Sequence, residues 1–183
     1  MNMRNTFIFS ALAIGWGACT SAQAEDFQSP MLGFFEAGVL CAQDGGLVRD
    51  APGTVAGTTH VVVDTPPFVS TGRMVPAVIG IGFGVRSGLA GSFEHDGVVM
   101  SVTHPPFAGS GTTEQTFTTR VGSQDAPGIT FYQFDYGYEL ALGEWTMTAT
   151  ASGITLYEAT FTVVPPSALP ELASVCGYQD LIG

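Results

Sequence analysis

Residues 143–164 have the sequence GEWTMTATASGITLYEATFTVV, in which apolar and polar side chains alternate along two consecutive runs. Before the Ser152-Gly153 pair, Trp145 and Met147 alternate with threonines. After it, Tyr157 and Phe161 follow the same pattern. A period of two is typical of a strand with one buried face and one hydrated face. The segment therefore predicts a β-hairpin with an apolar side over a core and a threonine-rich side facing water.

Similar short runs, separated by glycine and proline, occur through the rest of the chain. They predict strands at residues 34–41, 58–63, 75–85, 98–103, 113–120, 129–134, 144–150 and 154–164. Because proline has no N–H to give to a ladder, the Pro-Pro pairs at 66–67, 105–106 and 165–166 are each expected to end a strand. Many short strands with such turns favour an all-β, antiparallel sandwich, with one short helix near residues 168–176.

The first 24 residues have the features of a secretory signal peptide. Arg4 precedes an apolar run over about residues 7–18, which is shorter than the ~20 residues that a membrane-spanning helix needs. Small residues at Ala22 and Ala24 predict cleavage between Ala24 and Glu25. A membrane anchor and a buried first helix are the alternatives. The expected organisation is a signal peptide at 1–24, a β-sandwich domain at 25–164 and a C-terminal tail at 165–183.

The expected export determines how the cysteines should pair. Cleavage would remove Cys19 and leave Cys41 and Cys176, and an even pair in an oxidising compartment predicts a disulfide that ties the tail to the domain. Two unpaired buried thiols are the alternative. A lipoprotein anchored through Cys19 is disfavoured, because Trp16 stands where a lipobox usually has an aliphatic residue. The expected location is the periplasm or the outside of the cell.

The charge balance excludes several classes of function. After cleavage the chain has no lysine, and its four arginines stand against 16 carboxylates, which leaves a net charge of −12. Such a surface repels phosphate backbones, so we expect no nucleic-acid partner. Without lysine, a P-loop and a Schiff base are both unavailable. The mature chain also contains no apolar run long enough to be a transmembrane helix.

Seven strings follow one another along the chain: VPA (75–77), GIGFGV (80–85), VTHPP (102–106), FD (134–135), EL (139–140), GEWT (143–146) and FTV (161–163). In this order they resemble bacterial proteins that carry the domain of unknown function numbered 3859, over about residues 38–164. Residues 140–163 are also similar to the last two strands of many immunoglobulin-like domains. The resemblance thus implies an immunoglobulin-like β-sandwich, and it implies no catalytic residue.

Histidines are the first candidates for chemistry. His95 stands in Glu94-His95-Asp96, which could hold a metal with His104 only if the fold brings them together, and an exposed turn at 94–97 is the simpler expectation. Pro105 holds His104 extended, so His104 is a candidate binding residue, with a strand-end histidine satisfied by backbone as the alternative. We predict no metal site, no cofactor and no catalytic residue.

An aromatic string is the second candidate. At strand period, Tyr132, Phe134, Tyr136 and Tyr138 fall on one side of a strand. If exposed, Tyr132, Tyr136 and Tyr138 would form a platform for a sugar or a protein, and otherwise the row belongs to the core.

These observations predict an exported, non-catalytic interaction module of the bacterial cell envelope, with an envelope protein or glycan as its partner. The first alternative is a glycan-binding domain that uses the aromatic strand. The second is a small metal-binding protein or a hydrolase, which requires His60, His95 or His104 to meet carboxylates in a cleft.

Overall fold

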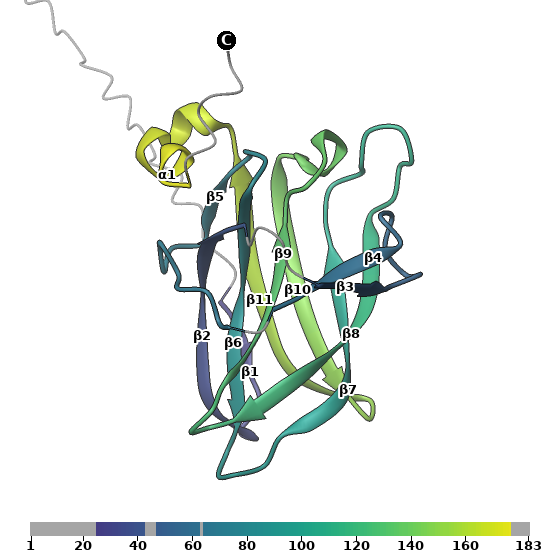
Figure 1. The fold of residues 1–183 in the computed structure, drawn as a ribbon, viewed down its shortest axis with the longest axis vertical. Coiled ribbons are helices and arrows are strands. Elements are labelled where there is room, and N and C mark those ends of the chain that lie inside the picture. Colours follow the sequence, from purple (N-terminus) through teal and green to yellow (C-terminus); the bar gives the residue numbers. More distant parts are fainter. Residues whose placement is uncertain (1–24, 43–46, 63, 177–183) are drawn as a thin grey trace, which may run out of the picture.

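The computed structural model describes residues 25–42, 47–62 and 64–176. Most of these residues lie in β-strands that curl around one core (Figure 1). The predicted signal peptide, with Cys19 and Ala24, lies outside the described residues. Within the described ranges, no helix has the length and apolar character needed to cross a membrane.

Nine strands form one connected sheet, and two more form a separate hairpin. The connected strands are β1 (Phe27–Gln28), β2 (Leu32–Cys41), β5 (Met74–Pro76), β6 (Ile81–Leu89), β7 (His95–Thr103), β8 (Glu114–Ser123), β9 (Gly128–Gln133), β10 (Gly143–Ala151) and β11 (Ile154–Val164). The hairpin consists of β3 (Leu47–Asp50) and β4 (Thr58–Val61). The helical elements are η1 (Gly137–Glu139), η2 (Pro166–Ala168) and α1 (Pro170–Ser174).

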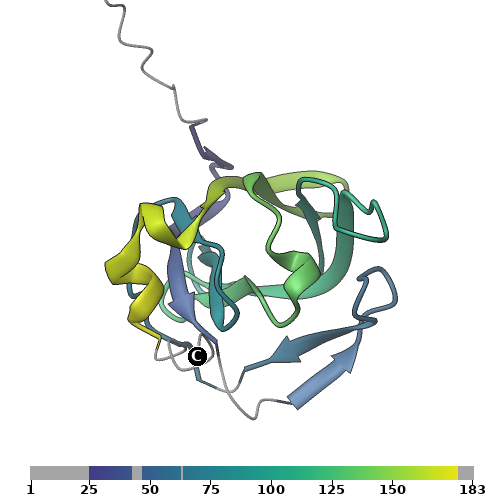
Figure 2. The same cartoon turned by 90° about the horizontal axis from the view of Figure 1, so that it is seen from above.

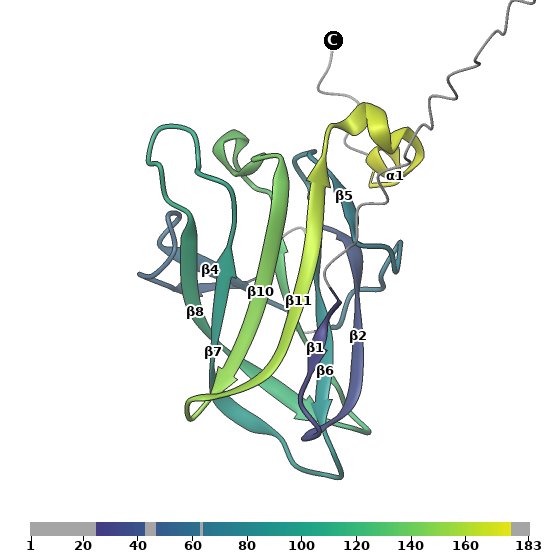
Figure 3. The same cartoon turned by 180° about the vertical axis from the view of Figure 1, so that it is seen from behind.

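The connected sheet has two curled halves. One half has the order β1-β11-β10-β7-β8 and forms the broad face in Figure 3, while β2, β6 and β9 form the other. A short parallel pairing of Gly88 with Gly122 and of Leu89 with Ser123 joins the two halves. Viewed from above, the strands enclose the core and the β3–β4 hairpin lies to one side (Figure 2). The predicted all-β class is confirmed, and β5 adds a second parallel pairing, with β11.

The predicted hairpin of residues 143–164 is present as β10 and β11. Trp145 pairs with Phe161 and Met147 with Ala159, and all four side chains are buried. Thr146, on the other face, pairs with a threonine of β11, and the threonines of this face are partly exposed. Because both strands turn their apolar residues inward, together they supply a large part of the core.

Several predicted elements require correction. The strand expected at 75–85 is divided into β5 and β6, because Gly80 adopts a positive φ of 85° in a turn between them. Residues 95–97, expected in an exposed turn, belong to β7, where a bulge shifts the register between His95 and Val98. Two short strands, β1 and β3, were not predicted, because β1 has two residues and the sequence LVRD of β3 shows no alternation.

The C-terminal tail packs back onto the domain. The helix predicted near 168–176 is shorter than expected, with α1 spanning five residues after the 3-10 turn η2. A disulfide joins Cys176, just beyond α1, to Cys41 at the end of β2, with Cα atoms 5.3 Å apart. The link closes a loop across 135 residues of sequence and ties the tail to the edge of the sheet.

Candidate functional site

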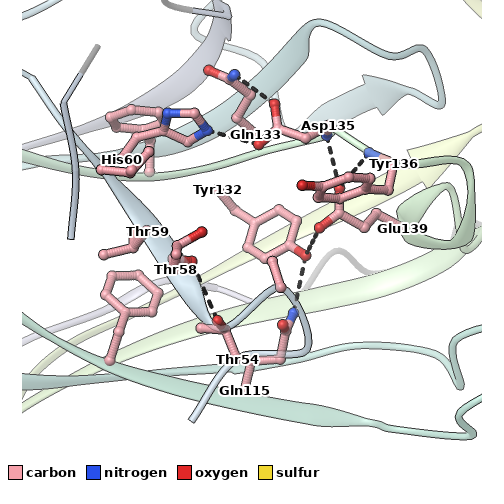
Figure 4. Close-up of a pocket in the computed structure, with 14 residues that line it drawn as sticks. Thr54, Thr58, Thr59, His60, Gln115, Tyr132, Gln133, Asp135, Tyr136 and Glu139 are labelled. Atoms are coloured by element: carbon pink, nitrogen blue, oxygen red, sulfur yellow. Dashed lines mark hydrogen bonds and ion pairs between the residues drawn. The ribbon is translucent and has the colours of Figure 1, made fainter. Parts of the chain in front are cut away.

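A small pocket lies between the β3–β4 hairpin and the end of β9 (Figure 4). Its volume is about 130 Å³, which corresponds to roughly four water molecules. Its lining combines polar and apolar side chains from four parts of the chain. The polar ones are Thr54 from the hairpin loop, Thr58, Thr59 and His60 from β4, Gln115 from β8, and Tyr132, Gln133, Asp135, Tyr136 and Glu139 from β9, η1 and the residues between them. The apolar ones are Val48, Ala56, Phe117 and Phe131. Pockets for drug-sized molecules are larger, about 300–1,000 Å³, so this one fits a small chemical group.

The turn η1 is held in place by the carboxylate of Glu139. Strand β9 ends at Gln133, and the backbone N–H groups of Asp135 and Tyr136 both donate to Glu139 Oε2, at 2.7 and 2.8 Å. This carboxylate thus satisfies donors at the start of the turn, in the manner of a capping box. The aromatic string therefore leaves the strand after Gln133, and Tyr136 does not continue its period.

A buried hydrogen-bond chain continues from Glu139 into the core. The hydroxyl of Tyr132 donates to Glu139 Oε1 at 2.7 Å, and Gln115 Nε2 donates to the Tyr132 oxygen at 3.0 Å. Gln115 Oε1 in turn accepts the N–H of Val55 at 2.9 Å, which attaches the loop of the β3–β4 hairpin. Because all three side chains are buried, each polar atom needs such a partner.

Burial changes the acidity of this chain. It raises the pKa of Glu139 above its ordinary value, although the hydrogen bonds from Tyr132 and from the backbone of Tyr136 and Asp135 act in the opposite direction. It also raises the pKa of Tyr132, and the neighbouring Glu139 charge adds to this effect. The tyrosine therefore stays protonated and serves as a permanent hydrogen-bond donor to the carboxylate.

His60, on β4, connects the β3–β4 hairpin to Asp135, which lies between β9 and η1. Its Nε2 lies 2.7 Å from Asp135 Oδ2, and Gln133 Nε2 donates to the other oxygen of the same carboxylate at 2.7 Å. About a third of the Asp135 side chain remains exposed, at 35%. Each Asp135 oxygen keeps a further lone pair, so the carboxylate can still accept a hydrogen bond from a ligand.

An aromatic stack leads from the surface beside the pocket to the core. Tyr136 is 49% exposed and stacks on Tyr138, with ring centroids 5.4 Å apart and an interplanar angle of 6°. Tyr138 packs edge-on against Phe107, which stacks on His104 at 3.8 Å, and His104 stacks on Trp145 at 4.6 Å. The half-exposed Tyr136 thus rests, through the partly buried Tyr138, on buried rings.

The structure separates the four predicted binding residues. His104 is buried, with a pKa lowered mainly by desolvation, and its Nδ1 lies 2.8 Å from the carbonyl oxygen of Pro105. Tyr132 is buried in the hydrogen-bond chain, so neither of these two side chains presents itself at the surface. Tyr138 is partly buried, and Tyr136 is half exposed at the rim of the pocket. The predicted platform is therefore reduced to the pair Tyr136 and Tyr138.

The histidines do not converge. His95 and His104 stand at the two ends of β7, nine residues and hence ~30 Å apart. Among the described residues, no group of three or more His, Cys, Asp or Glu side chains is arranged to hold a metal.

The sequence indicated no site role for Gln115, Asp135 or Glu139, and His60 was a candidate only for the metal-binding or hydrolase alternative. The one signal lay in the strings FD (134–135) and EL (139–140), which contain Asp135 and Glu139. His60 and Asp135 are 75 positions apart in the sequence, and only the fold places them together.

The fold and the pocket define the chain as an all-β domain with a small polar site at one end. It belongs to the family described as domain of unknown function DUF3859, whose model matches residues 28–163. A similar solved structure is that of an immunoglobulin-like protein from Pseudomonas aeruginosa, with 23% sequence identity and a TM-score of 0.48. That similarity covers 79% of this chain and 100% of the other. No curated protein matches the sequence.

Proposed function

We propose that this protein is an exported, non-catalytic binding module of the bacterial cell envelope. Its recognition surface is the end of the domain that carries η1, with Tyr136, Tyr138 and the adjoining pocket. The features of residues 1–24 and the disulfide between Cys41 and Cys176 support export, because disulfides persist mainly in oxidising compartments.

The observation that carries the proposal is the half-exposed Tyr136, stacked on the partly buried Tyr138 above buried rings. A stacked pair of aromatic rings offers a large contact area, and rings locked in place lose little conformational entropy on binding. Here the buried Glu139 fixes the turn and the Phe107–His104–Trp145 stack supports it from below. The arrangement is that of a recognition loop on a rigid β scaffold.

The hydrogen bonding of the pocket favours binding over catalysis. Both oxygens of Glu139 are taken up by internal donors, so this carboxylate has a positioning role. Asp135 and His60 form a pair, yet the described part of the pocket places no serine or cysteine beside His60 that could serve as a nucleophile. The pocket is also too small to enclose a substrate of ordinary size.

Photocrosslinking in living cells tests the proposal. A photoreactive phenylalanine derivative replaces Tyr136 in one strain and Ile154 in the control strain. Ile154 is 54% exposed and opens β11, at the opposite end of β10 and β11 from η1 (Figure 1). We expect one reproducible adduct from position 136 and none from position 154. Equal adducts from both positions, or none from either, would contradict the proposed recognition surface. Mass spectrometry of the same sample also gives the mature N-terminus, which tests the predicted cleavage site.

A further inference from the structure

We propose that the pocket beside Tyr136 receives an arginine side chain from a partner protein, with Asp135 as its carboxylate and Tyr136 as its stacking ring. This inference rests on the proposed function, because it names the chemistry that the recognition surface selects. It is argued from the way in which this protein accommodates its own arginines.

Two internal arginines show the environment that the fold gives to a guanidinium group. Arg73 donates to Asp26 and to the carbonyl oxygen of Ala37, each at 2.6 Å, and lies 5.4 Å from the ring centroid of Phe161. The guanidinium group of Arg73 is therefore held by three kinds of partner at once: a carboxylate, a carbonyl oxygen and an aromatic face.

The second internal site repeats the same set with different residues. Arg86 donates to Glu36 at 3.3 Å, donates to the carbonyl oxygen of Pro66, and lies 4.7 Å from the ring centroid of Phe68. Both carboxylates in these sites are only partly buried, at 17% exposure for Asp26 and 37% for Glu36. The 35% exposure of Asp135 falls within this range.

The pocket offers two of these three components, a carboxylate and an aromatic ring, without an arginine. It has the Asp135 carboxylate, the half-exposed ring of Tyr136, and oxygen acceptors from the threonines of the β4 region. The described arginines are all engaged elsewhere, since Arg73 and Arg86 occupy the two internal sites, Arg120 pairs with Glu94 at 3.6 Å, and Arg49 donates to the carbonyl oxygen of Thr118. Asp135 already pairs with His60, so an arginine that joins this site would come from another molecule.

Size and charge point to the same occupant. A pocket of about 130 Å³ accepts a flat group such as a guanidinium, but not a folded segment. Within the described residues, His60 is the only basic side chain that lines it, while Asp135 supplies a partly exposed carboxylate. The net charge of the whole chain, −11, attracts a basic partner over a longer range and repels an anionic glycan.

The test is an NMR titration of the processed, nitrogen-15-labelled protein with acetyl-Gly-Arg-Gly-amide. The salt concentration is 0.15 M, where the Debye length is about 8 Å, so that long-range attraction between the peptide and the acidic surface is screened. We expect the backbone amide signals of His60, Asp135 and Tyr136 to shift together. Asp135→Asn should weaken binding about tenfold, and Asp125→Asn should change it less than twofold. Asp125 is a matched control because it is exposed in the β8–β9 turn, separated from the pocket by the ~20 Å length of β9.

A second variant guards against a change in folding. Tyr136→Ser leaves the His60–Asp135 pair intact, and we expect it to weaken binding severalfold with an otherwise unchanged amide spectrum. The inference is overturned if shifts spread evenly over the acidic surface, if none appear, or if Asp135→Asn and Asp125→Asn behave alike. It is also overturned if chitohexaose, a neutral glycan, shifts these amides and the arginine peptide does not.

The crosslinking experiment separates failure of this inference from failure of the proposed function. An adduct at position 136 with a partner segment that contains an arginine, together with the peptide titration above, supports both. An adduct with a segment that lacks arginine, or with a glycan, refutes the arginine occupant and leaves the binding module in place. Absence of any adduct at position 136 contradicts both.

Discussion

Replacement of Glu139 by alanine provides the strongest test of the site architecture. The substitution removes the acceptor of three donors, namely the Tyr132 hydroxyl and the backbone N–H groups of Asp135 and Tyr136. If the carboxylate is the clamp of η1, its loss should destabilise the whole domain and release the Tyr136–Tyr138 stack. If Glu139 is buried without stabilising the turn, its replacement should give neither effect.

The size of the effect follows from the same contacts. A hydrogen bond to a charged group contributes about 1.5–3 kcal/mol, so three such bonds give a gross value of about 5–9 kcal/mol. Burial of the ionised carboxylate offsets several kcal/mol of this, as the raised pKa of Glu139 indicates. The two backbone N–H groups, which are only partly buried, regain water when the acceptor is lost. We therefore expect Glu139→Ala to lower the free energy of unfolding by about 3 kcal/mol at pH 7.

Urea unfolding followed by circular dichroism measures this change. With an m-value of roughly 2 kcal/mol/M, the unfolding midpoint should fall by about 1.5 M. The matched control is Glu144→Ala, which removes an exposed carboxylate at the start of β10 and should change stability by no more than about 0.5 kcal/mol. A loss below about 1 kcal/mol for Glu139→Ala, or equal losses for the two variants, would refute the clamp.

Three further outcomes are expected. Because burial raises the folded-state pKa of Glu139 above 4.5, its stabilising contribution is full below that pH and declines as pH rises through the folded pKa. The stability advantage of wild type over Glu139→Gln should therefore shrink from pH 4.5 toward neutrality in urea titrations, and a constant difference would contradict this. Replacing both Cys41 and Cys176 by serine opens a loop that spans 135 residues of sequence. Calorimetry should then show a loss of up to about 5 kcal/mol in the free energy of unfolding. No loss would mean that the disulfide-linked tail does not stabilise the domain. His104→Phe keeps a ring in the buried stack, so it should lower the free energy of unfolding by less than about 1.5 kcal/mol. The affinity for the arginine peptide should stay within about twofold of wild type. A loss of peptide binding without a loss of stability would assign His104 to the recognition surface.

Local patterns predicted the parts of the fold that depend on neighbouring residues. Alternation in residues 143–164 predicted the β10–β11 hairpin, and proline at Pro105 and Pro165 marked the ends of β7 and β11. The strand predicted at 129–134 agrees with β9 to within one residue at each end, but the expectation that Tyr136 and Tyr138 continue its period of two was wrong. The strand ends at Gln133 because Glu139, a residue beyond the aromatic string, pulls the backbone of Asp135 and Tyr136 into a turn.

The candidate site was accessible to sequence reasoning only in fragments. Tyr136 and Tyr138 were identified as candidate binding residues because aromatic rings crowd this segment, and the FD and EL strings contained Asp135 and Glu139 without indicating their role. Gln115 gave no signal, since a single glutamine in a threonine-rich strand looks like an ordinary solvated residue. Its burial follows from the tertiary position of β8 beside Tyr132 and the hairpin loop.

The sequence by itself determined the all-β class, the hairpin of residues 143–164, the acidic character and the cysteine pair that the structure joins. These properties depend on composition and on which side of a strand each residue occupies, both of which are encoded locally. Only the tertiary structure decided that His60 meets Asp135 and that Gln115, Tyr132 and Glu139 form one chain. Periodicity shows which face of a strand is buried, whereas the identity of its neighbours depends on strand order and register, which are set by packing of the whole core.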